Sequence, residues 1–127
     1  MAPREVFDRL VRGIAEERWD ELPDLYAEDA VVDQPFAPNT SRLEGREALR
    51  KHFAMAAGRV RLRTHNIVVH DTIDPEVIIA EFDYDGLALE TGRSFRASNI
   101  QVLRVRDGRI VESRDYHDHA ALAAALQ

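Results

Sequence analysis

The chain contains no cysteine, and it has no long run of apolar residues. The absence of cysteine excludes disulfide bonds, thiolate metal sites and cysteine nucleophiles. A membrane-spanning helix needs about 20 consecutive apolar residues, and no stretch approaches that length. Residues 1–5 carry an acid early and begin no apolar leader segment, so no signal peptide is predicted. We therefore expect a cytoplasmic protein with no membrane partner.

An excess of positive charge is also absent. The sequence has 23 acidic and 17 basic side chains, which gives a formal net charge of −6. Proteins bind nucleic acids by neutralising phosphates, so we expect no nucleic-acid partner. The basic cluster at residues 59–63 alternates arginine with apolar residues and favours a strand with one solvated face. No glycine-rich phosphate loop, serine elbow or dinucleotide fingerprint occurs, and we predict no cofactor.

The chain has enough residues for one hydrophobic core. It contains 127 residues, of which 45% are hydrophobic and 31% are charged. A domain of this size can bury roughly two-thirds of its unfolded surface, which leaves room for a pocket but not for a second domain. We predict a single domain over residues 1–127.

The first half of the chain predicts three helices and a short strand. Pro3 suits the first turn of a helix, and the apolar residues after it recur at helical spacing. Asp20 is a candidate N-cap with Pro23 in the first turn that follows, and Gly58 suits a helix end. The predicted elements are a helix over residues 3–17, a helix over 20–27, a strand over 30–34, a loop over 35–44 and a helix over 45–57.

In the second half the hydrophobic period changes from helical to two. Asp118 can then cap a short alanine-rich helix. The predicted elements are strands over residues 61–70, 77–89, 94–105 and 109–117 and a helix over 119–126. Helices followed by a meander of antiparallel strands predict an α+β domain in which helices cover one face of a curved sheet.

The most informative stretch is residues 106–118, whose sequence is RDGRIVESRDYHD. It predicts a turn, a strand and the start of a helix. Ser113, Asp115 and His117 fall at every second position, and a strand turns alternate side chains to one face. Polar groups on an inward face need partners, and a ligand can supply them. We predict that these three side chains share one wall of a pocket.

Two turns are possible at residues 106–108, and they give Asp115 different neighbours. A two-residue Asp-Gly turn places Asp115 opposite Ile100. A three-residue turn, with Gly108 left-handed in a bulge, shifts the register by one residue and turns every side chain to the other face. We prefer the second turn because it gathers the polar groups on one side. It pairs Val105 with Arg109, Gln101 with Ser113, Asn99 with Asp115 and Ala97 with His117.

Four segments carry a family resemblance: residues 19–31 (WDELPDLYAEDAV), 43–49 (LEGREAL), 91–95 (TGRSF) and 106–118. Through them the chain resembles the SnoaL-like, polyketide-cyclase-like branch of the nuclear-transport-factor-2-like superfamily, which includes ketosteroid isomerases and limonene-type epoxide hydrolases. The resemblance implies a cone-shaped fold in which three N-terminal helices pack on a strongly curved antiparallel sheet around a deep pocket. It also implies a homodimer. One such fold hosts many reactions, so the chemistry stays open.

Matched residue by residue, the resemblance argues against two known mechanisms. The acid and base positions of the ketosteroid isomerases correspond to Leu10, Gln34 and Gln101, which cannot exchange protons near neutral pH. The Arg-x-Asp pair of the limonene-type hydrolases corresponds to Phe82 and Tyr84, which cannot replace it.

Three residues are candidate catalytic groups. Asp115 matches the aspartate in the final Arg-Asp-Tyr of these hydrolases and the acid/base aspartate of SnoaL-like cyclases. A carboxylate in an apolar pocket can exchange protons near neutral pH, although an arginine-paired structural role is the alternative. His117 is a candidate proton shuttle or a half-exposed strand end. His52 lies on the apolar stripe of its helix, where the resemblance places it in the pocket, and its alternative is a satisfied core histidine.

Six further residues are candidate ligand contacts, in two groups. Asp33, Gln34 and Phe36 lead into a loop at the predicted pocket mouth, where Asp33 could instead cap a turn. The others, from central strands, are Tyr84, Asn99 and Gln101, whose alternatives are core packing or hydrogen bonds to one another. Trp19, Tyr26 and Phe82 are expected in the core. The alternation of Asp115, His117 and His119 resembles a ligand set, but His119 is better placed at a helix start, so no metal site is predicted.

These observations predict a cofactor-free acid–base enzyme for a small hydrophobic molecule that bears carbonyl or hydroxyl groups. Cyclase, isomerase and dehydratase reactions all fit. One alternative is a non-catalytic module for ligand binding or dimerisation, and another is an epoxide-hydrolase-like enzyme.

Overall fold

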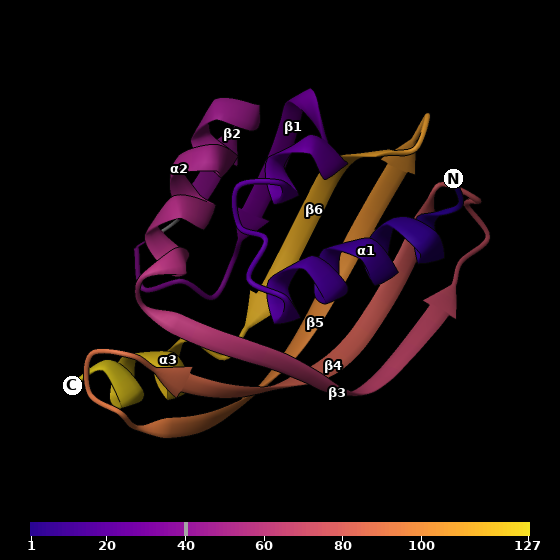
Figure 1. Ribbon diagram of the computed structural model, residues 1–127. Helices are drawn as coiled ribbons and strands as arrows, with labels where there is room; N and C mark the ends of the chain where they lie inside the picture. Colours follow the sequence, from indigo (N-terminus) through magenta and orange to yellow (C-terminus); the bar gives the residue numbers. More distant parts are fainter. Residues whose placement is uncertain (40) are drawn as a thin grey trace.

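The computed structural model describes residues 1–39 and 41–127 (Figure 1). The helical elements are α1 (Pro3–Ala15), the 3₁₀ helix η1 (Leu22–Leu25), α2 (Arg46–Ala57) and α3 (His119–Leu126). The strands are β1 (Tyr26–Gln34), β2 (Ser41–Glu44), β3 (Val60–Asp71), β4 (Val77–Ala88), β5 (Ser94–Arg106) and β6 (Arg109–His117). Within this part of the chain, every helix is too short or too polar to cross a membrane.

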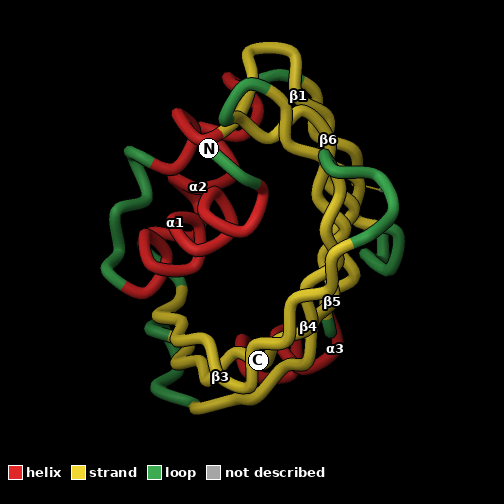
Figure 2. The backbone as a smooth tube through the Cα atoms, turned by 90° about the vertical axis from the view of Figure 1, so that its right-hand side faces the viewer, coloured by secondary structure: helices red, strands yellow, loops and turns green. Residues whose placement is uncertain are grey.

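The strands form one curved sheet in the order β2-β1-β6-β5-β4-β3. Figure 2 shows the sheet bending around α1 and α2, while α3 lies at the end of the sheet far from the β5–β6 turn. The predicted α+β class, with three N-terminal helical segments on a curved sheet and a short C-terminal helix, is confirmed. The sheet is mixed, because β1 runs parallel to β6 while the other neighbours are antiparallel. After β2 the chain passes through α2 to β3, at the opposite edge of the sheet. It then forms β4 and β5 in turn, and β6 is the strand that pairs with β1.

Two local predictions are wrong. The helix expected over residues 20–27 is only the short η1, and β1 already begins at Tyr26. Tyr26 and Val32 are buried at strand spacing, so pairing with β6 overrides the local helical preference. Within the loop expected over residues 35–44, the last four residues form β2, which pairs with β1.

The core joins the inner face of α1 to the concave side of the sheet. Phe7 of α1 packs on Phe82 of β4, with ring centroids 5.5 Å apart. Gly13 permits η1 to approach α1, because a Cβ atom there would lie 2.6 Å from Cδ2 of Leu22. The buried side chains of α1 are Val6, Phe7, Leu10, Val11 and Ile14.

The β5–β6 hairpin differs from both expected registers. Its turn is the two-residue Asp107–Gly108, with φ values of 52° and 77°, and Arg106 pairs with Arg109. The preferred three-residue turn is therefore wrong. The register then shifts by one residue, because Val111 is an extra residue on β6 that forms a β-bulge.

The bulge decides which side chains meet beyond it. Leu103 lies opposite Ser113, Gln101 opposite Asp115 and Asn99 opposite His117. These pairs differ from the predicted ones, but the predicted inward face is retained. It is retained because the bulge supplies the one-residue shift that the turn does not.

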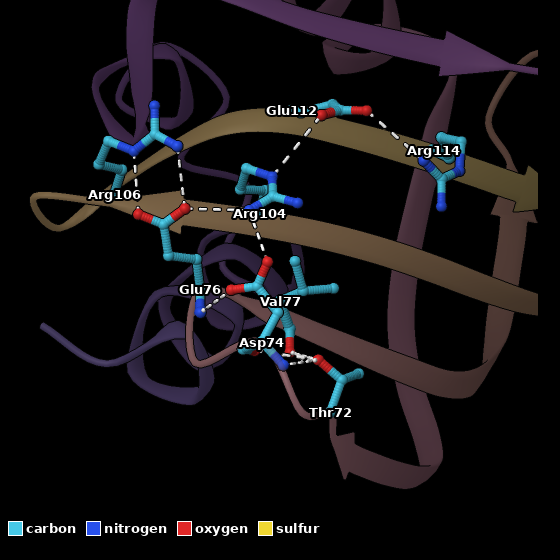
Figure 3. Close-up of polar contacts among 8 residues, drawn as sticks. All are labelled: Thr72, Asp74, Glu76, Val77, Arg104, Arg106, Glu112 and Arg114. Atoms are coloured by element: carbon cyan, nitrogen blue, oxygen red, sulfur yellow. Dashed lines mark hydrogen bonds and ion pairs between the residues drawn. The ribbon is translucent and has the colours of Figure 1, made fainter.

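A network of charges fastens the β3–β4 connection to the end of β5 (Figure 3). Glu76 accepts hydrogen bonds from Nε and Nη2 of Arg106, each 2.9 Å long, and from Nη1 of Arg104 at 3.0 Å. Nη1 of Arg104 also donates to Asp74 at 2.9 Å. The hydrogen bonds from Arg106 and Arg104 lower the pKa of Glu76 to about 2.

We expect the network around Glu76 to make the free energy of unfolding decrease at acidic pH. Because folding lowers the pKa of Glu76, its contribution is present above its ordinary pKa of 4.5 and is lost as pH falls toward about 2. Urea midpoints followed by circular dichroism should fall less steeply across this window in Glu76→Gln than in the wild type. Glu90→Gln, in an exposed turn, is the control. Equal slopes for the wild type and Glu76→Gln would contradict the prediction.

Candidate active site

A cavity of about 250 Å³ lies between the concave face of the sheet and the helices. Its volume is slightly below the range usual for small-molecule sites, so it suits a compact ligand. Much of its wall is aromatic, and the rings come from β1, α2, β4, β5 and the segment after α1. These aromatic residues are Trp19, Tyr26, Phe53, Tyr84 and Phe95.

Gly86 shapes one end of this wall. It lies opposite Phe95 in the β4–β5 pair, and a Cβ atom on Gly86 would overlap the Phe95 ring. The glycine therefore lets the ring lie flat over β4, where it lines the cavity.

The polar part of the wall forms two rows across neighbouring strands. In the first row Asp115 of β6 lies opposite Gln101 of β5. Gln34 occupies the next inward position of β1 on the other side of Asp115, because the preceding Asp33 pairs with Arg114. The second row places His117 opposite Asn99. The structure thus brings five predicted site residues together, namely Gln34, Asn99, Gln101, Asp115 and His117.

Asp115 is buried, with 7% of its surface exposed. One carboxylate oxygen accepts a short hydrogen bond from the Ser113 hydroxyl. The other lies 3.7 Å from Nε2 of His117. The arginine-paired alternative is not observed, since His117 is the only basic group within ion-pair distance of Asp115 among the residues described.

His117 is held by a chain of hydrogen bonds. Its Nδ1 lies 2.8 Å from Oδ1 of Asn99, and Nδ2 of Asn99 donates to the carbonyl of Ala97 at 3.2 Å. Because the Asn99 oxygen can only accept, Nδ1 of His117 carries the hydrogen. Nε2 is then free to exchange a proton with Asp115 or a ligand. Tyr84 stacks on the imidazole, with ring centroids 6.1 Å apart.

Two tyrosines line the cavity close to Asp115. Burial is the main cause that raises the pKa of both Tyr26 and Tyr84, and the negative charge of Asp115 adds to it. Their hydroxyls therefore stay protonated and can donate hydrogen bonds. Tyr84 was predicted as a ligand contact, whereas Tyr26 was expected in the core. The strand was predicted only over residues 30–34. Had it been extended back to Tyr26, the alternation of side chains would have placed Tyr26 on the same inward face as Val32 and Gln34.

Two further histidines face the cavity. Much of the surface of His52 is exposed, but the residue lines the cavity. Loss of hydration is the main cause that lowers the pKa of His52. The charge of Asp115 raises this pKa, and His117 lowers it. His119, at the start of α3, was not predicted as a site residue. Burial and then His117 lower the pKa of His119, while Asp115 and Asp118 oppose the shift. Across the described residues, no group of three or more possible metal ligands converges.

Three buried polar atoms on cavity residues lack a hydrogen-bond partner within the described part of the chain. They are Nε1 of Trp19, Oε1 of Gln101 and Nε2 of His119. Buried polar atoms are nearly always paired, and leaving one unpaired costs about 1–3 kcal/mol. These three atoms are hydrogen-bonding groups on cavity residues that a polar ligand or buried water can pair with.

Two predicted site residues lie outside the cavity. Asp33 faces away from it on β1, where its carboxylate lies 3.7 Å from Nε of Arg42. Phe36 is 67% exposed and packs edge-on against Tyr116, with ring centroids 5.2 Å apart. Both lie where the chain leaves β1, on the outer side of the sheet.

The profile of the SnoaL-like domain matches residues 7–113. The chain belongs to the SnoaL-like domain family. The uncharacterized protein YesE of Bacillus subtilis (strain 168) is 40% identical over 101 residues, or 77% of this chain and 67% of that protein. The crystal structure of a Bacillus subtilis protein that is provisionally named an isomerase matches with a TM-score of 0.90 at 31% sequence identity. This match covers 95% of this chain and 89% of that protein chain. The crystal structure of a Xanthomonas campestris protein that is provisionally named a polyketide cyclase matches with a TM-score of 0.83 at 20% identity. This match covers 98% of this chain and 96% of that chain.

These matches confirm the resemblance that the sequence motifs indicated. The matched region of this SnoaL-like protein ends at Ser113, two residues before Asp115. The fold is therefore that of the family, and Asp115 and His117 lie on β6 just beyond the matched region.

Proposed function

We propose that this SnoaL-like protein is a cofactor-free acid–base enzyme for a small, mostly apolar molecule that bears carbonyl or hydroxyl groups. The observation that carries the proposal is the buried carboxylate of Asp115, which faces His117 inside a cavity. Isomerisation, dehydration and aldol-type cyclisation all need a positioned group that takes a proton and returns it.

The proposed roles follow from position. Asp115 takes a proton from the carbon next to a carbonyl, and the C–H electron pair moves onto the carbonyl oxygen to form an enolate. The Tyr26 and Tyr84 hydroxyls donate hydrogen bonds to that oxygen. Asp115, with His117 as its proton partner, then returns the proton to carbon or to a leaving hydroxyl. The unpaired N–H of Trp19 and carbonyl of Gln101 suit an oxygen and a hydroxyl of the ligand.

The competing function is a non-catalytic pocket of the same fold. Leu10, Gln34 and Gln101 line the cavity at the positions that correspond to the acid and base groups of the ketosteroid isomerases. None of the three carries an acid group, which favours the non-catalytic pocket. An epoxide-hydrolase-like reaction has less support. Phe82 and Tyr84 occupy the places of its Arg-x-Asp pair, and the Phe82 ring packs on Phe7 in the core.

Hydrogen–deuterium exchange tests the enzymatic proposal without a known substrate. We expect the protein to accelerate exchange of the protons next to the carbonyl of small cyclic ketones in D₂O, with saturation, as followed by proton NMR. Trp19, the only tryptophan, lines the cavity and reports binding by its fluorescence. Ketones that quench Trp19 but show no accelerated exchange would support the non-catalytic pocket instead.

We further propose that the protein forms a homodimer through the outer face of the sheet. Apolar side chains stand exposed there around a hollow lined in part by Phe36, Val68, Ile100 and Tyr116. Phe36, Val68 and Ile100 are 67%, 49% and 42% exposed. Exposed apolar side chains on one face of a sheet favour association, and a twofold-related copy of the same face would cover them.

Ile100→Glu is expected to convert this dimer to a monomer, because it would bury two unpaired carboxylates near the twofold axis. Sedimentation velocity measures the change. Ile73→Glu is the matched control, since Ile73 lies fully exposed in the β3–β4 turn. A monomeric wild type, or an Ile100→Glu variant that stays dimeric, would exclude this interface.

A further inference from the structure

The cavity wall contains one buried acid and no buried lysine or arginine among the described residues. Asp115 receives a hydrogen bond from Ser113 and faces His117 at 3.7 Å, but within residues 1–39 and 41–127 no permanent cation pairs with it. Arg59 and Asp118, of opposite charge, are both exposed at the rim. The lowered pKa values of His52 and His119 favour their neutral forms. Among the described residues the interior therefore holds one buried carboxyl group and no buried permanent cation.

The carbonyl of Gln101 strengthens this acceptor character. Gln101 lies opposite Asp115 in the sheet, and its buried Oε1 has no donor within the described residues. An unpaired acceptor on the residue that pairs with Asp115 in the sheet is unfavourable without a ligand. A ligand with several N–H groups on one charged nitrogen would pair with both oxygens.

Aromatic rings complete the environment. Phe53 stacks on Trp19 with centroids 6.4 Å apart and packs against Tyr26 at 6.0 Å, so the three rings form a continuous wall. The faces of such rings attract ammonium groups, most strongly where water is excluded. The faces of the same rings attract no carboxylate, because their charge is negative as well.

From these three observations we infer that the cavity selects a small organic ammonium, with its nitrogen between Asp115 and Gln101 and its apolar part against the aromatic wall. The inference rests on the proposed function only in placing the ligand beside Asp115. It narrows the substrate class to carbonyl or hydroxyl compounds that also carry a basic nitrogen.

A charge series on one ring tests this selection. Benzylamine, benzyl alcohol and benzoate differ mainly in the charge of the substituent, and their affinities can be read from Trp19 fluorescence at neutral pH. We expect benzylamine to bind at least about tenfold more tightly than benzyl alcohol, and benzoate to bind most weakly. Asp115→Asn should remove the preference for the amine, and Gln101→Leu should reduce it about tenfold. Glu112→Gln, which removes one negative charge from the same strand but lies outside the cavity, should leave it unchanged.

Three results would overturn the inference: equal or tighter binding of benzyl alcohol or benzoate, an amine preference that survives Asp115→Asn, or no saturable response to benzylamine. None of these touches the exchange assay with ketones, so the proposed enzyme can stand while the ammonium selection fails. Conversely, selective amine binding without accelerated exchange, in cyclic ketones that also carry an amino group, would support the selection and reject the enzyme.

Discussion

Asp115→Asn is expected to lower the rate of ketone deuterium exchange by about 10²- to 10⁴-fold, the usual contribution of a positioned acid–base group. Asparagine keeps the size of the side chain, and its oxygen can still accept the Ser113 hydrogen bond. It cannot take up the proton that the reaction releases. Ketone binding, read from Trp19 fluorescence, and the urea midpoint should therefore change little, while the rate at saturation falls.

Glu112→Gln separates this effect from a general change of charge. Both substitutions remove one negative charge from β6, but Glu112 pairs with Arg104 and Arg114 on the outer face. The exchange rate of Glu112→Gln should equal that of the wild type. An Asp115→Asn protein that exchanges at the wild-type rate would remove Asp115 from the mechanism.

Asn99→Leu is expected to slow exchange by about 10- to 100-fold, the range known for lost orienting partners of histidine in metal sites. Asn99 is a positioning residue, because its oxygen holds the hydrogen on Nδ1 of His117 and leaves Nε2 toward Asp115. Leucine fills a similar volume but offers no acceptor. The imidazole then loses its fixed tautomer and part of its orientation.

Nitrogen NMR of His117 distinguishes this role from simple packing. The wild type should show the Nδ1–H tautomer, and Asn99→Leu should show a mixture or the Nε2–H form. Asn99→Asp keeps an acceptor oxygen and should retain the wild-type tautomer. If Asn99→Leu leaves both the tautomer and the exchange rate unchanged, His117 does not depend on Asn99 for its position.

Much of the site was predictable from local pattern. Alternation alone placed Ser113, Asp115 and His117 on one face of the last strand, because the period of a strand is two wherever it pairs. Helical spacing likewise predicted α1, and the four family segments predicted the curved sheet and the cavity. The strand face and the helix depend on neighbours in sequence, so the sequence contains them directly, whereas the sheet and the cavity followed from the family resemblance.

The partners of Asp115 were not predictable in this way. The hairpin needed both a two-residue turn and a bulge at Val111, and a bulge depends on how the whole strand packs rather than on the turn residues. The parallel pairing of β1 with β6 carried Gln34 to the other side of Asp115 and turned Asp33 outward. That pairing joins segments about 80 positions apart, and no local signal specifies it.

The sequence by itself therefore determined the fold class, the inward face of the last strand and the acid–base residue types on it. Only the tertiary structure decided that Asp115 lies between Gln34 and Gln101, in a wall that Trp19 and Tyr26 help to form. The physical reason is that side-chain direction follows local backbone period, whereas neighbours across strands follow from the packing of the whole chain.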